Sequence, residues 1–404
     1  MKILYVCHRF PYPPKRGGKI RPFNMIRHFG EQGHEVTVCS LARSPAEAEE
    51  AQGIAPYCKD FHIGLVRNPV QTLRMVARLP VPTPSSMGFF FSPDLARTID
   101  TIVRNQSWDL IFVHCSSVAQ YVAHVTGVPK ILDFGDMDSQ KWLEYANFKR
   151  FPLSLGYRLE GSKMMAAEKR LAGQFDLCTA TTRAEWETLD SFATGVPSDW
   201  FPNGVDSEFF CPGDELYDPD LISFIGRMDY YPNQEAMFRF CREVWPLLRR
   251  RRPTLKLVIV GADPSAAVRR LERLDGVTVT GSVPDVRPYV RQSAAMVAPL
   301  AIARGTQNKI LEAMSMGVPV VTSSMAAGGV DAQSEKHFLV ADNPDQYASA
   351  ILRILDDPAE RTRLARAGRD RMLGHHAWPN SMARLDAIVD RCITAFTASQ
   401  RISA

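Results

Sequence analysis

A lysine and a glutamate three residues apart, Lys309 and Glu312, are the first residues of this chain whose types and spacing suggest chemistry. Both fall near the start of a predicted helix, where backbone N–H groups without intrahelical partners combine with a lysine to suit a phosphate. The carboxylate lies on nearly the same helix face and can accept hydrogen bonds from a pair of ribose hydroxyls. The alternative is that both side chains are exposed and only stabilise the helix.

The segments on either side of this helix predict a strand, a turn and a second strand. The apolar run 296–300 is typical of a buried parallel strand, and Gly305 and Thr306 are expected to supply a flexible turn and the N-cap. Gly317 and Pro319 end the helix before the next strand. The helix N-terminus therefore opens at the carboxyl edge of a sheet, where doubly wound proteins bind ligands.

Polar side chains also follow two apolar runs in the first half of the chain. His114 ends the run 108–114, and Asp136 and Asp138 follow the run 129–134. A polar residue at the carboxyl end of a buried strand faces the crevice, so His114 is a candidate for contact with a reacting group, the alternative being a core histidine with satisfied hydrogen bonds. The aspartates suit hydrogen bonding on the acceptor side, because no third ligand has the spacing of a metal site.

A pair of glycines, Gly17 and Gly18, lies in a predicted loop at 11–18, between a strand at 2–7 and a helix at 21–29. The dinucleotide fingerprint G-x-G-x-x-G is absent, which argues against a Rossmann oxidoreductase. Adjacent glycines let the backbone approach a bulky ligand, although an ordinary flexible loop would look the same.

Length and composition predict a cytoplasmic enzyme with two domains. The chain has 404 residues and a net charge of +4 with acids and bases well mixed, which gives no case for nucleic-acid binding. Eight cysteines are scattered without C-x-x-C spacing, as expected for buried thiols in a reducing compartment. Neither a signal peptide nor an apolar span of about 18 residues is evident.

The segment 141–172 is predicted to be helical, amphipathic and basic, with several aromatic residues. It is expected either to lie on the inner face of the cell membrane, where it would receive a lipid-linked acceptor, or to pack between the domains. The run Arg249–Arg252 suggests anionic lipid more weakly, because a solvated helix end explains it equally well.

Two α/β series of similar size follow one another along the chain. The turn-rich segment 200–210 separates them, and a new strand begins near residue 221. The predicted fold class is therefore α/β, with two doubly wound, Rossmann-like domains facing a central cleft, at residues 1–202 and 203–378.

A series of short motifs in this order resembles the GT-B glycosyltransferases of the family 4 type, among them the bacterial exopolysaccharide sugar transferases. The resemblance covers nearly the whole chain. Its motifs, besides Gly17–Gly18 and His114, are Gly33–Val38, Pro202–Asp206, Gly226–Arg227, Gly281 with Pro284–Val286, Leu311–Met314 and Gly317–Val321.

The resemblance implies roles for individual residues. In the second domain Glu312 holds the ribose of a UDP- or GDP-linked sugar, Arg227 holds the diphosphate, and the loop 281–283 lies beside the base. In the first domain His114 contacts the transferred sugar, and the backbone of Gly17 lies near the phosphates. The expected catalytic residues are His114, Arg227 and Lys309. The expected donor-binding residues are Gly17, Gly18, Gly226, Arg227, Gly281, Val283, Arg304, Gly305, Thr306, Lys309 and Glu312.

The resemblance also implies an activity. The enzyme would be a hexosyltransferase that retains anomeric configuration, needs neither a metal nor a cofactor, and serves bacterial polysaccharide synthesis with a glycan or polyprenyl-linked acceptor. The helix at 379–404 would cross back to the first domain.

Two positions depart from the family pattern. Asn233 stands where a lysine and glycine are usual after the arginine, and Arg304 replaces the first of two glutamates that stand eight positions apart. We infer that positive charge has moved into the loop 304–309. Two alternatives remain: a nucleotide-sugar epimerase, and a non-catalytic nucleotide-sugar-binding protein that keeps Arg227, Lys309 and Glu312.

Overall fold

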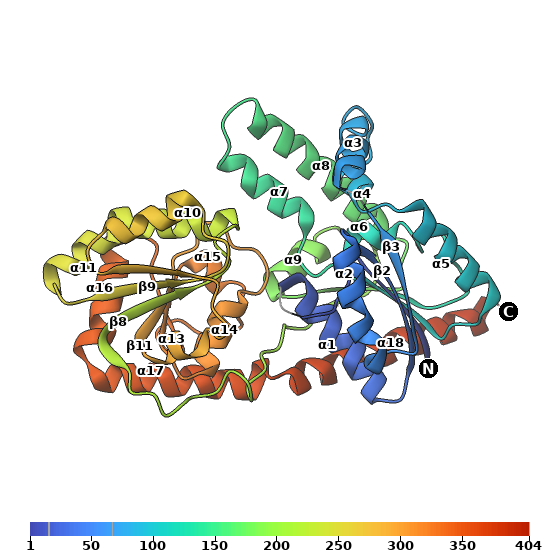
Figure 1. Cartoon of the computed structure of the whole chain (residues 1–404). Coiled ribbons are helices and arrows are strands. Elements are labelled where there is room, and N and C mark those ends of the chain that lie inside the picture. The colour runs from blue at the N-terminus through green and yellow to red at the C-terminus, as the bar shows by residue number, and fades with distance from the viewer. Residues whose placement is uncertain (15–16, 67, 404) are drawn as a thin grey trace. The chain divides into compact units, whose positions relative to one another are not determined.

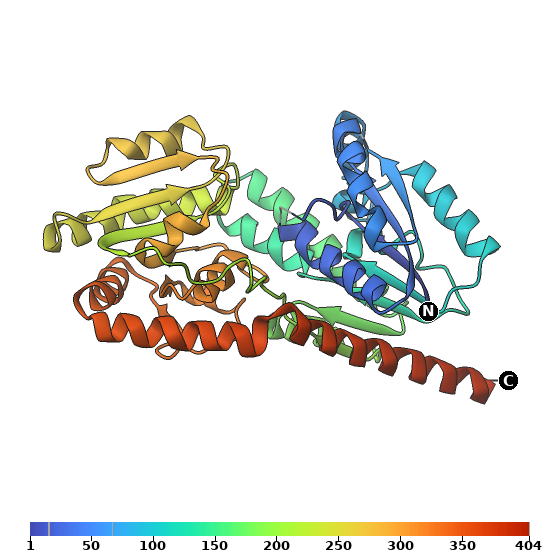
Figure 2. The same cartoon turned by 60° about the horizontal axis from the view of Figure 1, so that its bottom comes forward.

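Two parallel sheets organise the chain, one in each of two units (Figure 1). The computed structural model describes residues 1–14, 17–66 and 68–403. The first unit comprises Met1–Phe201 together with Met382–Ala404, and the second comprises Pro202–Ser381. Each unit is an α/β domain with helices on both faces of its sheet, which confirms the predicted fold class (Figures 1 and 2).

The sheet of the first unit has seven strands in the order β3-β2-β1-β4-β5-β6-β7, and all its neighbours pair in parallel. The strand order reverses between β1 and β4, which makes this pair the topological switch point where doubly wound sheets bind ligands. The strands are β1 (Lys2–Cys7), β2 (Glu35–Ala42), β3 (Asp60–Leu65), β4 (Leu110–His114), β5 (Lys130–Asp133), β6 (Leu177–Ala180) and β7 (Ser198–Trp200).

The helices of the first unit differ from the expected ones at two places. Helix α1 begins at Gly17, so both glycines lie in its first turn rather than in a loop; residues 15–16 of the expected loop lie outside the described residues. The basic segment 141–172 forms two helices, because Phe148–Pro152 is not helical. The helices are α1 (Gly17–Glu31), α2 (Pro45–Glu50), η1 (Ala51–Tyr57), α3 (Asn68–Ala77), α4 (Ser85–Phe89), α5 (Pro93–Asn105), α6 (Ser116–Ala119), α7 (Asp138–Asn147), α8 (Leu153–Ala172) and α9 (Arg183–Asp190).

The sheet of the second unit has six parallel strands in the order β10-β9-β8-β11-β12-β13, with its switch point between β8 and β11. The strands are β8 (Asp218–Ile225), β9 (Lys256–Val260), β10 (Val277–Gly281), β11 (Ser293–Ala298), β12 (Val320–Thr322) and β13 (Leu339–Val340). The helices are α10 (Tyr231–Arg239), η2 (Phe240–Val244), α11 (Trp245–Arg251), α12 (Ala266–Arg269), η3 (Arg270–Arg273), α13 (Arg287–Arg291), α14 (Asn308–Ser315), α15 (Ser324–Ala327), α16 (Pro344–Asp356), α17 (Pro358–Arg371) and η4 (Met372–His376).

The last helix, α18 (Trp378–Ser403), contributes its residues from Met382 onward to the first unit. Its apolar face is buried, and Arg391 pairs with Asp199 at 2.7 Å. Asp386 accepts a hydrogen bond from His28 of α1 at 2.8 Å. Neither α18 nor any other helix among the described residues is long and apolar enough to cross a bilayer.

Candidate active site

The predicted donor residues of the second unit gather at the carboxyl ends of neighbouring strands. Gly226 and Arg227 follow β8, Gly281 ends β10, and the loop 299–307 follows β11 and leads into α14. Because β10, β9, β8 and β11 are adjacent in the sheet, these segments share one edge, and they flank the switch point. Val283 packs partly buried against the core of this unit.

Helix α14 begins one residue later than predicted. Gln307 occupies the N-cap position, and Thr306 lies outside the helix, so the predicted N-cap is wrong. The Gln307 amide donates to the carbonyl of Arg304 at 3.1 Å and caps no N–H group. The Thr306 hydroxyl and the Asn308 side-chain oxygen Oδ1 are buried, and neither has a partner within the described part of the chain. This helix start therefore presents polar groups that a ligand can satisfy.

Lys309 reaches from α14 to the residues that follow β8. Its ammonium donates to the side-chain oxygen of Asn233 at 2.6 Å and lies 4.5 Å from the centroid of the Phe224 ring. The Asn233 amide in turn donates to the carbonyl of Arg227 at 2.8 Å. A Cβ at Gly226, where φ is 156°, would lie 3.0 Å from the ammonium, so this turn leaves no room for a side chain. The Lys309 ammonium thus lies at the Asn233 turn.

Burial shifts the pKa of Lys309 and of Glu312 in opposite directions. Desolvation lowers the pKa of Lys309 to about 7, although the nearby Glu312 carboxylate opposes this shift. Desolvation also raises the pKa of Glu312 to about 7, against the effect of Lys309. Two groups that titrate in the physiological range at one helix start are typical of a functional site.

This pair predicts a bell-shaped pH dependence of binding for a nucleoside diphosphate such as UDP. A diphosphate favours protonated Lys309, so affinity should fall as pH rises above about 7, and hydrogen bonds from ribose favour ionised Glu312, so affinity should also fall below about 7. Isothermal titration calorimetry between pH 5.5 and 9 would measure this. In Lys309→Arg the loss of affinity at alkaline pH should disappear, because arginine stays charged. If that loss is unchanged, a group other than Lys309 causes it.

Arg227 is held by two carboxylates. Its guanidinium donates to Asp229 at 3.0 and 2.7 Å and to Asp263 at 2.5 Å. Asp263 follows β9 and adopts φ 55°, an uncommon conformation for a residue other than glycine. The arginine side chain remains 38% exposed, so a phosphate can approach it in competition with these carboxylates.

Removing the arginine tests its role directly. We expect Arg227→Ala to lower kcat by about 10²-fold, because one preorganised donor to the developing charge is lost. Steady-state kinetics with saturating donor would measure this, and circular dichroism would verify folding. Arg239→Ala, which removes an exposed arginine of α10 that pairs only with Glu243 among the described contacts, is the matched control. Equal activities in the two variants would remove Arg227 from the site.

In the first unit His114 is organised by a buried aspartate. Its Nδ1 lies 2.7 Å from Asp133 Oδ2, and Asp133 also accepts hydrogen bonds from Arg21 at 2.9 and 3.0 Å and from Thr179 at 2.9 Å. Burial alone would raise the pKa of Asp133, but Arg21 and His114 hold it well below its usual range. The ionised carboxylate accepts the Nδ1 proton, so Nε2 is the ring nitrogen left to form a hydrogen bond with a ligand.

His8 is a second histidine at this edge. It follows β1, which pairs with β4, and its ring centroid lies 5.7 Å from that of His114. Burial, with the adjacent His114, lowers its pKa well below the usual value. Its Nδ1 is buried and has no partner among the residues described. The position of His8 just after a buried strand is the signal that could have marked it in the sequence.

The two aspartates after β5, Asp136 and Asp138, lie in different environments. Asp136 accepts a hydrogen bond from Thr181 at 3.1 Å, and Asp138 opens α7. Burial raises the pKa of Asp138, with Lys141 opposing this shift and Asp136 adding to it. Gly135, at φ 67°, lies between them and His114, and a Cβ there would come 3.3 Å from the histidine ring. Throughout the described ranges, no three His, Cys, Asp or Glu side chains are arranged to hold a metal ion.

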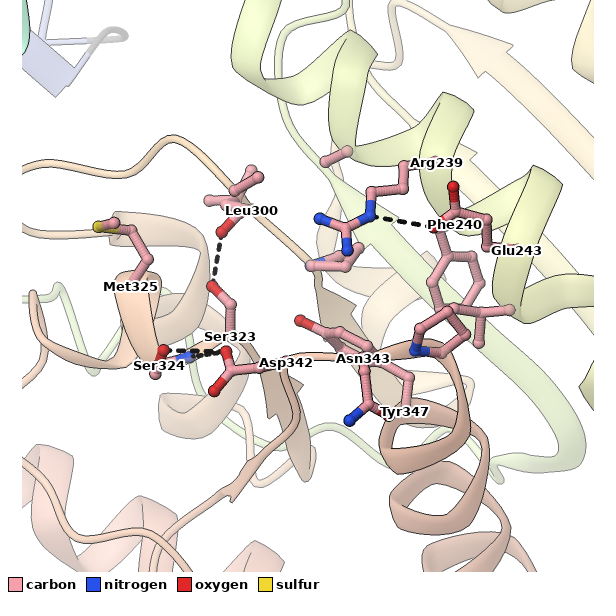
Figure 3. Close-up of a pocket in the computed structure, with 15 residues that line it drawn as sticks. Arg239, Phe240, Glu243, Leu300, Ser323, Ser324, Met325, Asp342, Asn343 and Tyr347 are labelled. Carbon is pink, nitrogen blue, oxygen red and sulfur yellow. Dashed lines mark hydrogen bonds and ion pairs between the residues drawn. The ribbon is translucent and has the colours of Figure 1, made fainter. Parts of the chain in front are cut away.

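A pocket in the second unit lies apart from these residues (Figure 3). It is at the carboxyl ends of β11, β12 and β13, against α10 and α16. Several of its charged and polar groups are engaged, since Arg239 pairs with Glu243 and Ser324 donates to Asp342, whereas the Tyr347 hydroxyl is buried with no hydrogen-bond partner among the described residues (Figure 3). None of the predicted donor residues lines this pocket, so it is not the candidate site.

Two doubly wound domains, each with polar residues at its switch point, define a class of protein. The same architecture occurs in sucrose-phosphate synthase from Thermosynechococcus elongatus, which superposes with a TM-score of 0.73 at 16% identity and covers 98% of this chain and 100% of that one. Anabaena HepE in complex with UDP gives a TM-score of 0.70 at 13% identity, covering 97% and 100%. These likenesses identify the GT-B fold.

Sequence comparisons give the family. The model described as Glycosyltransferase Family 4 matches residues 16–209, and that described as Glycosyl transferases group 1 matches residues 219–357. The chain therefore belongs to the GT-B glycosyltransferases, with a family 4-type first domain and a group 1-type second domain.

Individual relatives are distant. An uncharacterized 44.6 kDa protein in the cps region of Klebsiella pneumoniae is 19% identical over 87% of this chain and 90% of its own length. The D-inositol 3-phosphate glycosyltransferase of Acidothermus cellulolyticus is 25% identical over half of each chain. The match to glycosyltransferase 1 domain-containing protein 1 of Xenopus tropicalis is 23% identical and spans 34% of this chain and 42% of that protein.

Proposed function

We propose that this glycosyltransferase moves a sugar from a nucleotide-sugar donor to a glycan or lipid-linked acceptor, with retention of configuration. The observation that carries the proposal is the Lys309 ammonium beside Asn233 and the Gly226–Arg227 turn, with Glu312 one helical turn away. The solved structures of Anabaena HepE with UDP and with UDP-glucose support a nucleotide-sugar donor. The relative from a cps region supports a role in bacterial polysaccharide synthesis.

In the proposed reaction the bond from the anomeric carbon to the diphosphate oxygen breaks as the acceptor oxygen bonds to that carbon. The acceptor proton passes to the leaving diphosphate oxygen on the same face of the sugar. Negative charge grows on the diphosphate in the transition state, where Lys309, Arg227 and the first-turn amides of α14 stabilise it more than in the ground state. His114, through Nε2, orients a hydroxyl of the transferred sugar.

Arg304 bears on the choice of sugar. It stands where the family pattern has a glutamate that contacts the sugar, so we propose that it favours an acidic sugar such as a uronate. A donor panel that contains UDP-glucuronate and UDP-glucose tests this directly. Acceptance of neutral sugars alone would contradict it.

The function itself is tested by mass spectrometry of products after incubation with a panel of nucleotide sugars and a membrane extract. We expect a glycosylated acceptor to form only when donor and acceptor are both present, and to form equally with EDTA. The anomeric coupling constant of the product, measured by NMR, should match that of the donor sugar. An epimerase would convert the donor without acceptor, a binding protein would convert nothing, and an inverted anomer would contradict the retaining mechanism.

We also propose a cytoplasmic protein with peripheral contact to the inner face of the membrane. A lipid-linked acceptor would require such contact. The surface of the protein that makes this contact can be identified independently of the donor-binding residues.

A further inference from the structure

More than half of the exposed large apolar side chains in the described part of the chain lie in two segments of the first unit. One segment is α3 with the turns that follow it, and the other is the α7–α8 turn with the start of α8. Phe151 is 81% exposed and Leu73 is 70% exposed. The members are Val70, Leu73, Val76, Leu79 and Val81 in the first segment, and Phe148, Phe151, Leu153, Leu155 and Leu159 in the second. We call this set the apolar face.

The two segments are joined to one another. The Lys163 ammonium of α8 donates to the carbonyl of Leu79 at 2.6 Å, and the Glu160 carboxylate accepts from the backbone amides of Ser85 and Ser86 at 3.1 and 2.8 Å. Figure 1 draws α3 and the α7–α8 turn at the same end of this unit. The apolar face therefore consists of two exposed segments that these contacts tie together within one unit.

The exposed apolar side chains recur at intervals of three or four residues, so they lie on one face of each helix. Val70, Leu73 and Val76 recur every three residues along α3, and Leu155 and Leu159 are four residues apart on α8. Isolated exposed apolar residues are ordinary, but several on one helix face or one turn mark an interaction site.

The charged residues near the apolar face indicate which kind of partner it binds. Residues 68–93 contain Arg74 and Arg78 and no acidic residue, and residues 145–159 contain Lys149, Arg150 and Arg158 and no acidic residue. Arg150 and Arg158 are exposed. Large apolar side chains interleaved with cations alone are complementary to a bilayer with anionic headgroups. A second copy of this face would bring like charges together.

The other basic run of the chain does not share this character. In Arg249–Arg252, Arg249 pairs with Asp275, and Arg252 pairs with Asp220 and with Asp356. These cations are engaged within the second unit, so the run is better explained as part of that domain than as a lipid contact.

We propose that the apolar face inserts into the surface of an anionic bilayer and places the first unit on the membrane. The side chains of Phe151 and Leu73 enter the headgroup region, while Arg150 and Arg158 contact lipid phosphates. This inference rests on the proposed function for the identity of the acceptor. It adds that the acceptor comes from the lipid phase. Binding to the membrane itself requires neither donor nor acceptor.

The test is sedimentation of the full-length protein with vesicles of phosphatidylglycerol and phosphatidylcholine, without donor or acceptor. We expect binding to mixed vesicles and little to pure phosphatidylcholine. Phe151→Ser and Leu73→Ser should each lower the partition coefficient by roughly tenfold, the expected effect of withdrawing one large apolar side chain from the bilayer. Arg150→Gln with Arg158→Gln should lower it by a similar factor and flatten its dependence on salt.

Leu216→Ser is the matched control, because Leu216 is 93% exposed but belongs to the second unit. It should bind vesicles like the unchanged protein. Equal binding by Phe151→Ser, Leu73→Ser and the control would overturn the proposal, as would concentration-dependent dimerisation lost in the first two variants with no vesicle binding. Donor turnover is measured separately with a water-soluble acceptor, so that loss of catalysis and loss of membrane binding are distinguishable.

Discussion

Lys309→Ala should weaken UDP binding and, with saturating donor, lower kcat by about 10² to 10³-fold, because the lost ammonium acts most on charge that develops in the transition state. The fold depends little on this side chain, since its ammonium contacts Asn233 and lies against Phe224, and its removal leaves an amide that can bond to water. Single-turnover kinetics with saturating donor would separate the chemical step from binding.

The control for this variant is Lys336→Ala, which removes an exposed lysine of the same unit. Its turnover should match that of the unchanged protein. Lys309→Arg should recover part of the activity lost in Lys309→Ala, since arginine supplies a cation with a different geometry. Near-normal turnover in Lys309→Ala would exclude the lysine from catalysis and leave Arg227 as the cation of the site.

Asp133→Ala should lower the free energy of unfolding by about 3 to 5 kcal/mol, because it leaves the buried Arg21 without its ionic partner. It should also abolish sugar transfer, since His114 loses the acceptor that orients its ring. Urea unfolding followed by tryptophan fluorescence would measure the first effect. Asp94→Ala, at an exposed carboxylate of the same unit, should change stability by no more than about 0.5 kcal/mol.

The same aspartate predicts the response to acid. The folded protein holds the pKa of Asp133 below its unfolded value of about 3.9, so its contribution is fully present above about pH 5 and is lost as pH falls through the unfolded and then the folded pKa. In Asp133→Asn this part of the acid sensitivity should be missing. A stability difference between the two proteins that stays constant from pH 6 to pH 3 would contradict this account.

Central strands such as β1, β4 and β11 could be predicted because they are buried on both faces and appear as continuous apolar runs. His114 could be selected for a related reason: a polar residue that directly follows such a run emerges at the sheet edge. The structure extends that rule to His8, which follows β1 and lies beside His114. The short strands β7 and β13 were not predicted, because three residues or fewer at a sheet edge carry too little pattern.

The partners of the site residues could not be predicted in the same way. Arg21 and Asp133 are brought together by α1 and β5, which are far apart in sequence, and neither is marked by a local motif. The sequence pattern selects Asp136 and Asp138 instead, because they lie just beyond the strand, whereas Asp133 is its last residue. Likewise, Asp263 meets Arg227 only because β8 and β9 are neighbours.

The return of α18 to the first unit has a consequence for synthesis on the ribosome. Leu385, Ile388 and Val389 are buried in the unit whose sheet was translated first, while Pro202–Ser381 forms the other unit. The second unit can therefore fold as soon as it emerges, whereas the first must wait, with the apolar surface that α18 covers still exposed, until this helix has left the exit tunnel. The domain that is made first is the domain that is completed last.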